Sequence, residues 1–311
     1  FAIEGNTGIS GHGDGLKGGI SATWGANSEK GNVTTNLSFN HREGILHKDR
    51  DWANPPCETV SYNLNGEIQS VCGSTTYPGG NAEYLGYADP SYIIDYPDYV
   101  VFQGPEADWH LMQPYYEVWQ EQNPGHPYDI YNWGEIQALT GTIDQFNIVS
   151  NGHYEMSEWV TAYFSTIYSY IRNAGRYAGE PVSDRPGTLF GGPLLVHISS
   201  PFIPESYRTE IIDGYGINYD LPYLQMRKRT NDIGARVFDQ TSNTFNTVVG
   251  LRGEITPDYK WDIFFNYSRS QRISVTNNSP DMQRFQIAID PEACYAMPGC
   301  VLANLFGEGV M

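Results

Sequence analysis

The stretch GNVTTNLSFNHRE, residues 31–43, decides the fold class because its side chains alternate in character with a period of two. The largely apolar face of such a strand carries Val33, Thr35, Leu37 and Phe39. The opposite face carries Thr34, Asn36, Ser38 and Asn40. In a soluble sandwich the apolar face would meet a protein core, whereas in a transmembrane barrel it would meet lipid and the polar face would line a wet lumen. The rest of the sequence must indicate whether the apolar face meets a protein core or lipid.

The composition favours β-structure and excludes a nucleic-acid partner. The 311 residues include 36 acidic and 18 basic side chains, a net charge of −18 that supplies no basic surface for phosphates. Aromatic residues make up 14% of the chain and there are 33 glycines, which is typical of β-proteins. A mean hydropathy of −0.44 and the lack of a long apolar run predict no transmembrane helix. A transmembrane barrel would escape that test because its strands alternate.

Four cysteines form two local pairs, each in a segment that contains Gly, Pro or Asn. Their even number, their short spacing and the lack of a CxxC motif or a nearby pair of histidines favour disulfides over a metal site. We therefore predict the disulfides Cys57–Cys72 and Cys294–Cys300. Disulfides imply an oxidising compartment. A disulfide that closes a loop of about 15 residues stabilises the folded protein by roughly 3 kcal/mol.

Strand-like runs and the connections between them indicate an antiparallel transmembrane β-barrel. The runs lie at about 1–10, 16–28, 32–43, 142–154, 158–171, 233–255 and 260–274. The connections 29–31, 155–157 and 256–259 are tight, whereas 44–141 and 172–232 are long. Short turns on one rim and longer loops on the other are typical of outer-membrane barrels. Trp24, Trp159 and Trp261 lie near strand ends, where the aromatic residues of a membrane interface belong.

This pattern divides the chain into barrel segments and external loops. The barrel segments are 1–43 with the first strands, the hairpin 142–171 and the hairpin 233–274. The extracellular loops are 44–141, which is acidic and aromatic, 172–232, and 275–311 as the start of a further loop. Seven strands would leave two open edges, which hydrocarbon does not tolerate. We therefore expect the chain, which ends in GEGVM, to be part of a larger barrel.

The long loop is the most unusual segment. From Asp51 to Thr140 there are 13 acidic residues, 11 Tyr and 4 Trp, and no Lys or Arg. Aromatic rings beside carboxylates suit sugars, whose apolar faces stack while their hydroxyls donate to the carboxylates. The candidate sugar-binding residues are Trp109, Trp119, Trp133, Asp108, Glu117 and Glu135.

Two other interpretations of this loop stay open. Carboxylates in a flexible loop are also suitable ligands for Ca²⁺, which takes six to eight oxygens. The candidate calcium ligands are Asp95, Asp98, Glu106 and Asp108. The loop could instead be a self-packed, solvated surface without a ligand. No catalytic spacing and no nucleophile, zinc or nucleotide motif is present, so we expect no enzyme and no required cofactor beyond candidate Ca²⁺.

Several motifs, taken in order, resemble those of the TonB-dependent receptors of Gram-negative outer membranes. They are GANSEKGNVTTNLSFNHRE (25–43), DRDW (49–52), HISSPFIP (197–204), RKRTNDIGARVF (227–238), GLRGEI (250–255), WDIFFNYSRSQ (261–271), RFQIAID (284–290) and CVLANLFGEG (300–309). The last departs from the usual pattern at Leu302 and Ala303, and the motif at 197–204 departs at Ser200 and Ile203. These departures leave the barrel prediction intact but weaken any assignment of a ligand.

The resemblance implies a 22-stranded barrel, plugged by an N-terminal domain that couples to the TonB complex. The plug and the last strands lie outside this sequence. It implies an outer-membrane transporter with extracellular loops, which takes up a scarce oligosaccharide or metal chelate with energy from the inner membrane. Lipid and lipopolysaccharide would surround it. Two alternatives stay open: a structural or docking barrel that binds a surface protein through its acidic loop, and a secreted carbohydrate-binding β-sandwich.

Overall fold

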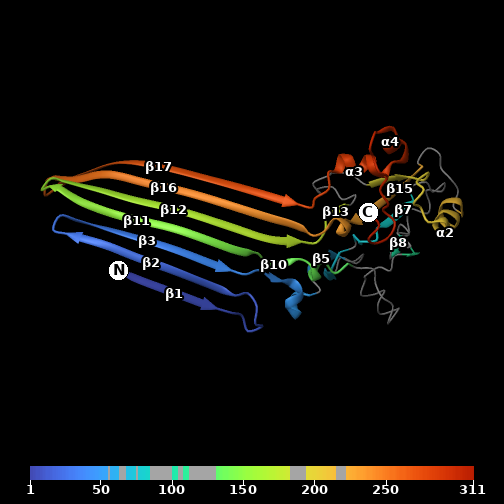
Figure 1. Ribbon diagram of the computed structural model, residues 1–311, viewed down its shortest axis with the longest axis horizontal. Helices are drawn as coiled ribbons and strands as arrows, with labels where there is room; N and C mark the ends of the chain where they lie inside the picture. Colours follow the sequence, from blue (N-terminus) through green and yellow to red (C-terminus); the bar gives the residue numbers. More distant parts are fainter. Residues whose placement is uncertain are drawn as a thin grey trace. The chain divides into compact units, whose positions relative to one another are not determined.

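The computed structural model describes residues 1–54, 57–62, 68–74, 76–84, 100–103, 108–111, 131–182, 194–214 and 222–311 (Figure 1). The chain forms two compact units, and each is assembled from three separate parts of the sequence. Unit 1 comprises Phe1–Asp49, Ala138–Arg176 and Val237–Thr276. Unit 2 comprises Arg50–Gln137, Tyr177–Arg236 and Asn277–Met311.

Unit 1 is built on one seven-stranded sheet whose spatial order follows the order of the chain. The strands are β1 (Ala2–Gly8), β2 (Lys17–Ser28), β3 (Gly31–Arg42), β11 (Thr142–Ser157), β12 (Val160–Tyr177), β16 (Arg236–Thr256) and β17 (Tyr259–Asn277). A short ladder of β4 (Ile45–Leu46) with β10 (Ala138–Thr140) lies in the same unit. The seven strands lie side by side in Figure 1. The prediction of an all-β, antiparallel protein is thus confirmed.

Connections between these strands are sorted by length. Two residues join β2 to β3, β11 to β12 and β16 to β17, namely 29–30, 158–159 and 257–258. The connections at the opposite ends of the strands are longer, and two of them carry the parts of unit 2 that lie between β3 and β11 and between β12 and β16. β11, β12, β16 and β17 have 16, 18, 21 and 19 residues, which exceeds the usual five or six of a strand.

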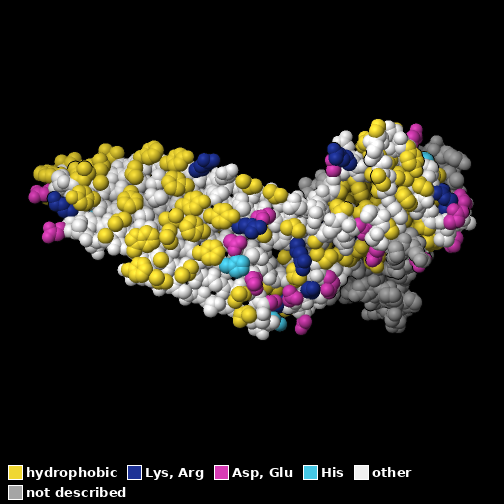
Figure 2. All heavy atoms as spheres, in the orientation of Figure 1, with side chains coloured by type: hydrophobic (Ala, Val, Ile, Leu, Met, Phe, Trp, Pro, Cys, Tyr) yellow, Lys and Arg dark blue, Asp and Glu magenta, His cyan; other side chains and the backbone are white. Residues whose placement is uncertain are grey.

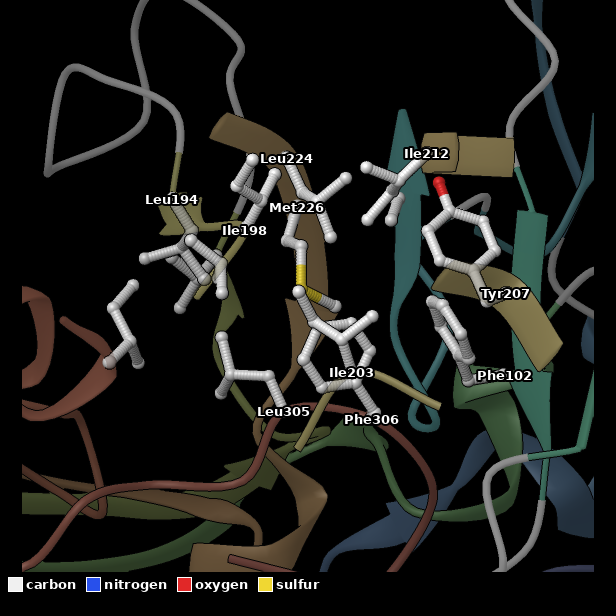
Figure 3. Close-up of a cluster of buried hydrophobic side chains, with 14 residues drawn as sticks. Phe102, Leu194, Ile198, Ile203, Tyr207, Ile212, Leu224, Met226, Leu305 and Phe306 are labelled. Atoms are coloured by element: carbon white, nitrogen blue, oxygen red, sulfur yellow. The ribbon is translucent and has the colours of Figure 1, made fainter. Parts of the chain in front are cut away.

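Unit 2 contains a second sheet of short strands with β15 at its centre. Its strands are β7 (Asn81–Tyr84), β8 (Val100–Gln103), β9 (Asp108–Leu111), β13 (Pro181–Val182), β14 (Leu194–His197) and β15 (Tyr223–Arg229). β15 pairs with β7, β13 and β14. The side chains of Leu224 and Met226 alternate inward along β15 and are fully buried. Figure 3 shows them in a cluster with Phe102, Tyr207, Leu305 and Phe306, which come from distant parts of the chain.

Short helices and a hairpin complete this unit. The helices are η2 (Asp51–Ala53), η4 (Trp133–Glu135), α2 (Glu205–Tyr207) with the π-helical turn η5 (Arg208–Asp213), η6 (Asn231–Ile233), α3 (Met282–Ile289) and α4 (Pro291–Ala296). A further short helix, η1 (His47–Asp49), belongs to unit 1. The carboxylates of Asp281 and Asp290 cap α3 and α4 by accepting from backbone N–H groups of their first turns. The segment 275–311, predicted as a loop, therefore contains two capped helices.

The predicted disulfide Cys294–Cys300 is confirmed and joins α4 to the segment that follows it. The other predicted pair lies in a hairpin of β5 (Cys57–Tyr62) and β6 (Ile68–Cys72), where the backbone register sets Cys57 opposite Cys72. The side chains of that hairpin lie outside the described part of the structure.

Two buried cations join distant segments of unit 2. The ammonium of Lys228 donates to the carbonyl oxygens of Pro78 and Gly307, both at 2.8 Å, and lies 3.4 Å from Asp232 Oδ2. The Arg229 guanidinium donates to Thr76 O, Gly179 O and Ser74 Oγ. Burial lowers the pKa of Lys228 below its ordinary value and lowers the pKa of Arg229 to about 10. Three parts of the chain are thus held by two consecutive residues of β15.

Candidate functional site

The register of the long sheet gathers apolar side chains on one face. Leu37 lies opposite Ala22 and Ile148, and Ile148 lies opposite Tyr168. Residues directly opposite each other on neighbouring strands point to the same side of a sheet. The face so defined, called the apolar face, also carries Ile3, Ile20, Trp24, Val33, Phe39, Phe146, Phe164, Phe245, Val249, Ile263, Phe265 and Tyr267.

Large side chains of the apolar face are exposed. The exposed fraction is 57% for Ile20, 45% for Phe39, 69% for Ile263 and 63% for Phe265. Figure 2 shows hydrophobic side chains spread over the strands of unit 1, with few charged side chains among them. Soluble monomers rarely expose a continuous apolar surface that extends across a whole sheet. The apolar face is therefore a candidate surface for contact with an apolar medium or partner.

Hydroxyl groups on the apolar face bond to one another. Thr35 Oγ1 lies 2.8 Å from Ser150 Oγ, and Thr166 Oγ1 lies 2.8 Å from Thr247 Oγ1. Each pair bridges two neighbouring strands, and Thr35 is directly opposite Ser150 in the register. A hydroxyl that faces hydrocarbon without a partner costs free energy, and pairing removes that cost. The hydroxyls of these two pairs thus have partners within the sheet.

A groove crosses the apolar face near the two-residue turns. Its volume is about 890 Å³, and apolar side chains line most of it. Small residues, among them Ala26, Gly31 and Ala162, open it between larger neighbours. The larger lining residues include Val33, Tyr154, Phe164, Val249, Leu251, Ile263 and Phe265. The groove could accept flexible apolar chains.

A row of charged residues borders the apolar face on the side away from the two-residue turns. Asp144 lies opposite both His41 and Arg172 in the register. His41 Nδ1 is 2.6 Å from Asp144 Oδ1, and the Arg172 guanidinium contacts both carboxylate oxygens of Asp239. No local sequence pattern reveals this row because its four members come from four strands. The register alone brings them together.

The opposite face of the sheet is largely polar and carries a network of amides and hydroxyls, with Ile167, Ile171 and Phe264 as exposed apolar exceptions. Asn147 Nδ2 donates to Ser38 Oγ at 3.2 Å, while Asn147 Oδ1 accepts from Ser169 Oγ at 2.8 Å. Further bonds of this kind join Asn36 to Thr23, Ser165 to Asn151 and Asn246 to Asn266. A face with this many amides and hydroxyls suits contact with water or with another polar surface.

Two of the predicted sugar-binding residues lie on β9. Asp108 is exposed. The indole of Trp109 donates from Nε1 to Ser206 Oγ at 2.8 Å, and its ring meets that of Tyr207 edge-on at 5.4 Å. Trp109 is partly buried and packs against the core cluster of unit 2. Its ring thus contributes to packing in this structure.

The remaining predicted site residues divide into two groups. Trp133 and Glu135 lie in η4, where Glu135 Oε1 accepts from the side-chain amides of Asn54 and Asn132. Outside the described residues lie Trp119, Glu117, Asp95, Asp98 and Glu106. Within the described ranges, no three His, Cys, Asp or Glu side chains converge in a way that could hold a metal ion. The sugar and calcium assignments therefore stay predictions.

Comparison of the chain with protein-family models, with curated proteins and with solved structures finds no match. In the part of the chain that the structure describes, no helix has both the length and the apolar character needed to cross a membrane.

Proposed function

We propose that the seven-stranded sheet is the membrane-embedded part of an outer-membrane β-barrel. The observation that carries this proposal is the exposed apolar face with its paired hydroxyls. Lipid is the apolar medium that would cover such a face, and the amides and hydroxyls of the opposite face would then line a wet lumen. This arrangement answers the question raised by residues 31–43: Leu37 and Phe39 face lipid, and Asn36 and Ser38 face the lumen.

The dimensions of the apolar face support the proposal. On β17 the face begins near Trp261, continues through Ile263, Phe265 and Tyr267, and reaches a charged side chain at Arg269. A transmembrane strand needs about 9–11 residues, which agrees with the interval from Trp261 to Arg269. Tyr267 and Trp261 then lie at the two interfaces, where amphipathic rings are favoured.

The edges of the sheet require closure in this setting. β1 and β17 are the outer strands of the seven-stranded sheet. Exposed N–H and C=O groups of an edge strand are not tolerated in hydrocarbon. We therefore propose that further strands complete the barrel, and the resemblance to TonB-dependent receptors puts the total at 22.

The activity we propose is the one that this resemblance implies. A plug coupled to the TonB complex would drive uptake of a scarce oligosaccharide or metal chelate, and unit 2 would form part of the extracellular surface that meets the ligand. Four of the motifs that carry the resemblance lie wholly or partly in unit 2, namely those at 197–204, 227–238, 284–290 and 300–309. This supports the proposal that the surface formed by unit 2 has an architecture like that of TonB-dependent receptors. The acidic segment from Asp51 to Thr140 favours a neutral or cationic ligand over a free anion.

A second candidate function is a structural or docking barrel. The same acidic segment, with its 13 acidic residues and no Lys or Arg, could bind a basic surface protein. Deletion of the gene distinguishes the two functions. A transporter is required for growth on its ligand and depends on the TonB complex, whereas a docking barrel copurifies with a stoichiometric partner and needs no energy.

The membrane assignment is tested by one pair of substitutions in the full-length protein. Leu37→Arg sets a charge on the apolar face and is expected to cost about 2–4 kcal/mol if Leu37 lies at the bilayer midplane. Thr34→Arg, on the same strand but on the polar face, is the matched control and is expected to cost little.

The readout is the mobility of outer-membrane protein on gels, boiled and unboiled, combined with the urea midpoint of refolding into lipid vesicles. The proposal expects a heat-modifiable band that Leu37→Arg weakens and Thr34→Arg preserves. A soluble, heat-insensitive protein, or equal effects of both substitutions, would refute it.

A further inference from the structure

A small cleft with polar side chains in its lining lies on the apolar face between β12, β16 and β17. It has a volume of about 220 Å³ and is lined by Tyr168, Asn243, Phe245, Arg269 and Gln271. Tyr168 OH donates to Asn243 Oδ1 at 3.2 Å, and the ring of Phe245 lies 6.2 Å from that of Tyr267. Alternation along β17 turns Arg269 and Gln271 to the same side as Tyr267. The cleft therefore belongs to the face that we assign to lipid.

The cleft offers donors and positive charge. Arg269 is exposed and, among the described residues, has no carboxylate partner, in contrast to Arg172, which is paired with Asp239. Asn243 Oδ1 accepts from Tyr168, which leaves the amino group of Asn243 as a donor. Gln271 adds a second amide. No Asp or Glu is found in the described lining, so the local charge is positive within a chain of net charge −18.

A guanidinium beside two amides is suited to a phosphate group. Arginine binds phosphate through two parallel hydrogen bonds, and these charge-assisted bonds are about twice as strong as neutral ones. A free anion would have to approach against the negative charge of the whole chain. A phosphate already anchored in the membrane has no such approach to make, because its acyl chains hold it at the interface.

The surroundings of the cleft fit an amphiphile. Phe245 forms one wall, and four residues further along β16 Val249 lines the apolar groove. Four residues of a strand span about 13 Å, so a lipid whose head group is at Arg269 would extend its acyl chains along the apolar face toward this groove. The polar and the apolar parts of the surface are thus continuous along one strand.

From these observations we infer that the cleft at Arg269 is a binding site for the phosphate group of a membrane lipid. The inference rests on the proposed function, because the site meets lipid only if the apolar face is embedded. Arg269 and the amino group of Asn243 bind the phosphate, Gln271 closes the cleft, and the groove receives acyl chains.

The test uses the purified full-length protein in a neutral detergent, with phosphatidylglycerol as the probe and binding measured by native mass spectrometry. Arg269→Gln is expected to weaken binding about tenfold, the equivalent of one strong charge-assisted interaction. Arg269→Lys retains the charge without the planar fork and is expected to bind with intermediate affinity. Arg272→Gln is the matched control, since Arg272 lies on the same strand but on the opposite face, and it is expected to bind like the wild type.

Each result decides between sources and explanations. Equal binding by wild type and Arg269→Gln overturns the inference, as does equal weakening by Arg269→Gln and Arg272→Gln, which would indicate a general effect of charge. Displacement of the lipid by millimolar inorganic phosphate would show a site for free anions and would overturn the lipid assignment. Boiled and unboiled samples of each variant are run in parallel. A heat-modifiable protein without site-specific binding refutes only this inference, whereas a soluble, heat-insensitive protein refutes the proposed function itself.

Discussion

Single side chains in unit 2 form hydrogen bonds with more than one segment of the chain. The ammonium of Lys228 is fully buried and has three hydrogen atoms to donate. Two of its partners, Pro78 O and Gly307 O, come from segments far from β15 in the sequence. The third partner, Asp232, is four residues away. Loss of this one amine would leave two carbonyl oxygens without their donor and the Asp232 carboxylate, which still accepts from the Gly309 N–H, without its cation.

We expect Lys228→Met to destabilise unit 2 by about 3–5 kcal/mol, the usual cost of removing one partner of a buried ion pair. Methionine has a similar length, so lost volume does not explain the effect. Hydrogen exchange at the amides of β15 and β7 in the full-length protein measures it. Lys260→Met, which breaks the exposed pair of Lys260 and Glu254, is the control and should leave that exchange unchanged. Equal protection in Lys228→Met and wild type would contradict the role of this lysine.

Cross-strand pairs of hydroxyls offer the most direct test of whether the apolar face is embedded in lipid. The hydroxyls of Thr35 and Ser150 belong to β3 and β11 and satisfy each other at 2.8 Å. In hydrocarbon, removal of the Ser150 hydroxyl leaves Thr35 Oγ1 without this partner, whereas in water the solvent would replace it. Removal of the Thr35 hydroxyl leaves Ser150 Oγ with its longer bond to Thr34 O at 3.4 Å.

We therefore expect Ser150→Ala alone to cost about 1–3 kcal/mol, Thr35→Val alone to cost less, and the double variant to cost less than the sum of the two. The measurement is the urea midpoint of the protein folded in lipid vesicles. Additive effects of the two substitutions would indicate that water reaches this pair and that the face is not embedded.

Sequence patterns predicted the long strands well because an alternating strand carries its own signal. The run from Trp261 to Tyr267 repeats its apolar residues over several periods, and β17 includes that run. The strands of unit 2 have only two to seven residues and pair with distant partners, as β7 does with β15. Such short segments show too few periods to be recognised. Their sheet and its buried core therefore became visible only in the structure.

The roles of the candidate site residues were also hard to predict from the sequence, because they depend on neighbours from other strands. Arg269 continues the alternation of β17 and gives no sign of its role until the register brings Tyr168 and Asn243 beside it. Trp109 was selected for its ring and its acidic neighbours, but the structure packs that ring against Tyr207. A single residue type shows which chemistry is available. Its neighbours decide which chemistry is used.

The long sheet of unit 1 has two kinds of end, one with two-residue turns and one with longer connections, and lysines mark both. Lys48 is exposed in η1, beyond the end of β3 that leads into the long connections. Lys30 lies in a two-residue turn, and Lys260 follows another. In the proposed orientation, the long connections face the outside of the cell and the short turns face the periplasm.

We expect a membrane-impermeant amine reagent to label Lys48 on intact cells and to spare Lys30 and Lys260. Cells with a permeabilised outer membrane should show labelling of all three, which controls for reactivity. Mass spectrometry of tryptic peptides gives the extent at each site. Labelling of Lys30 but not of Lys48 on intact cells would reverse the proposed orientation.

The way in which the two units share the chain also sets an order of events during biogenesis. Unit 2 takes its three parts from before β11, from between β12 and β16, and from after β17. A ribosome that has synthesised only the first part has made Pro78 but neither Lys228 nor Gly307, so the bonds that close unit 2 do not yet exist. A complete unit 2 therefore requires that all seven strands of the long sheet have already been synthesised.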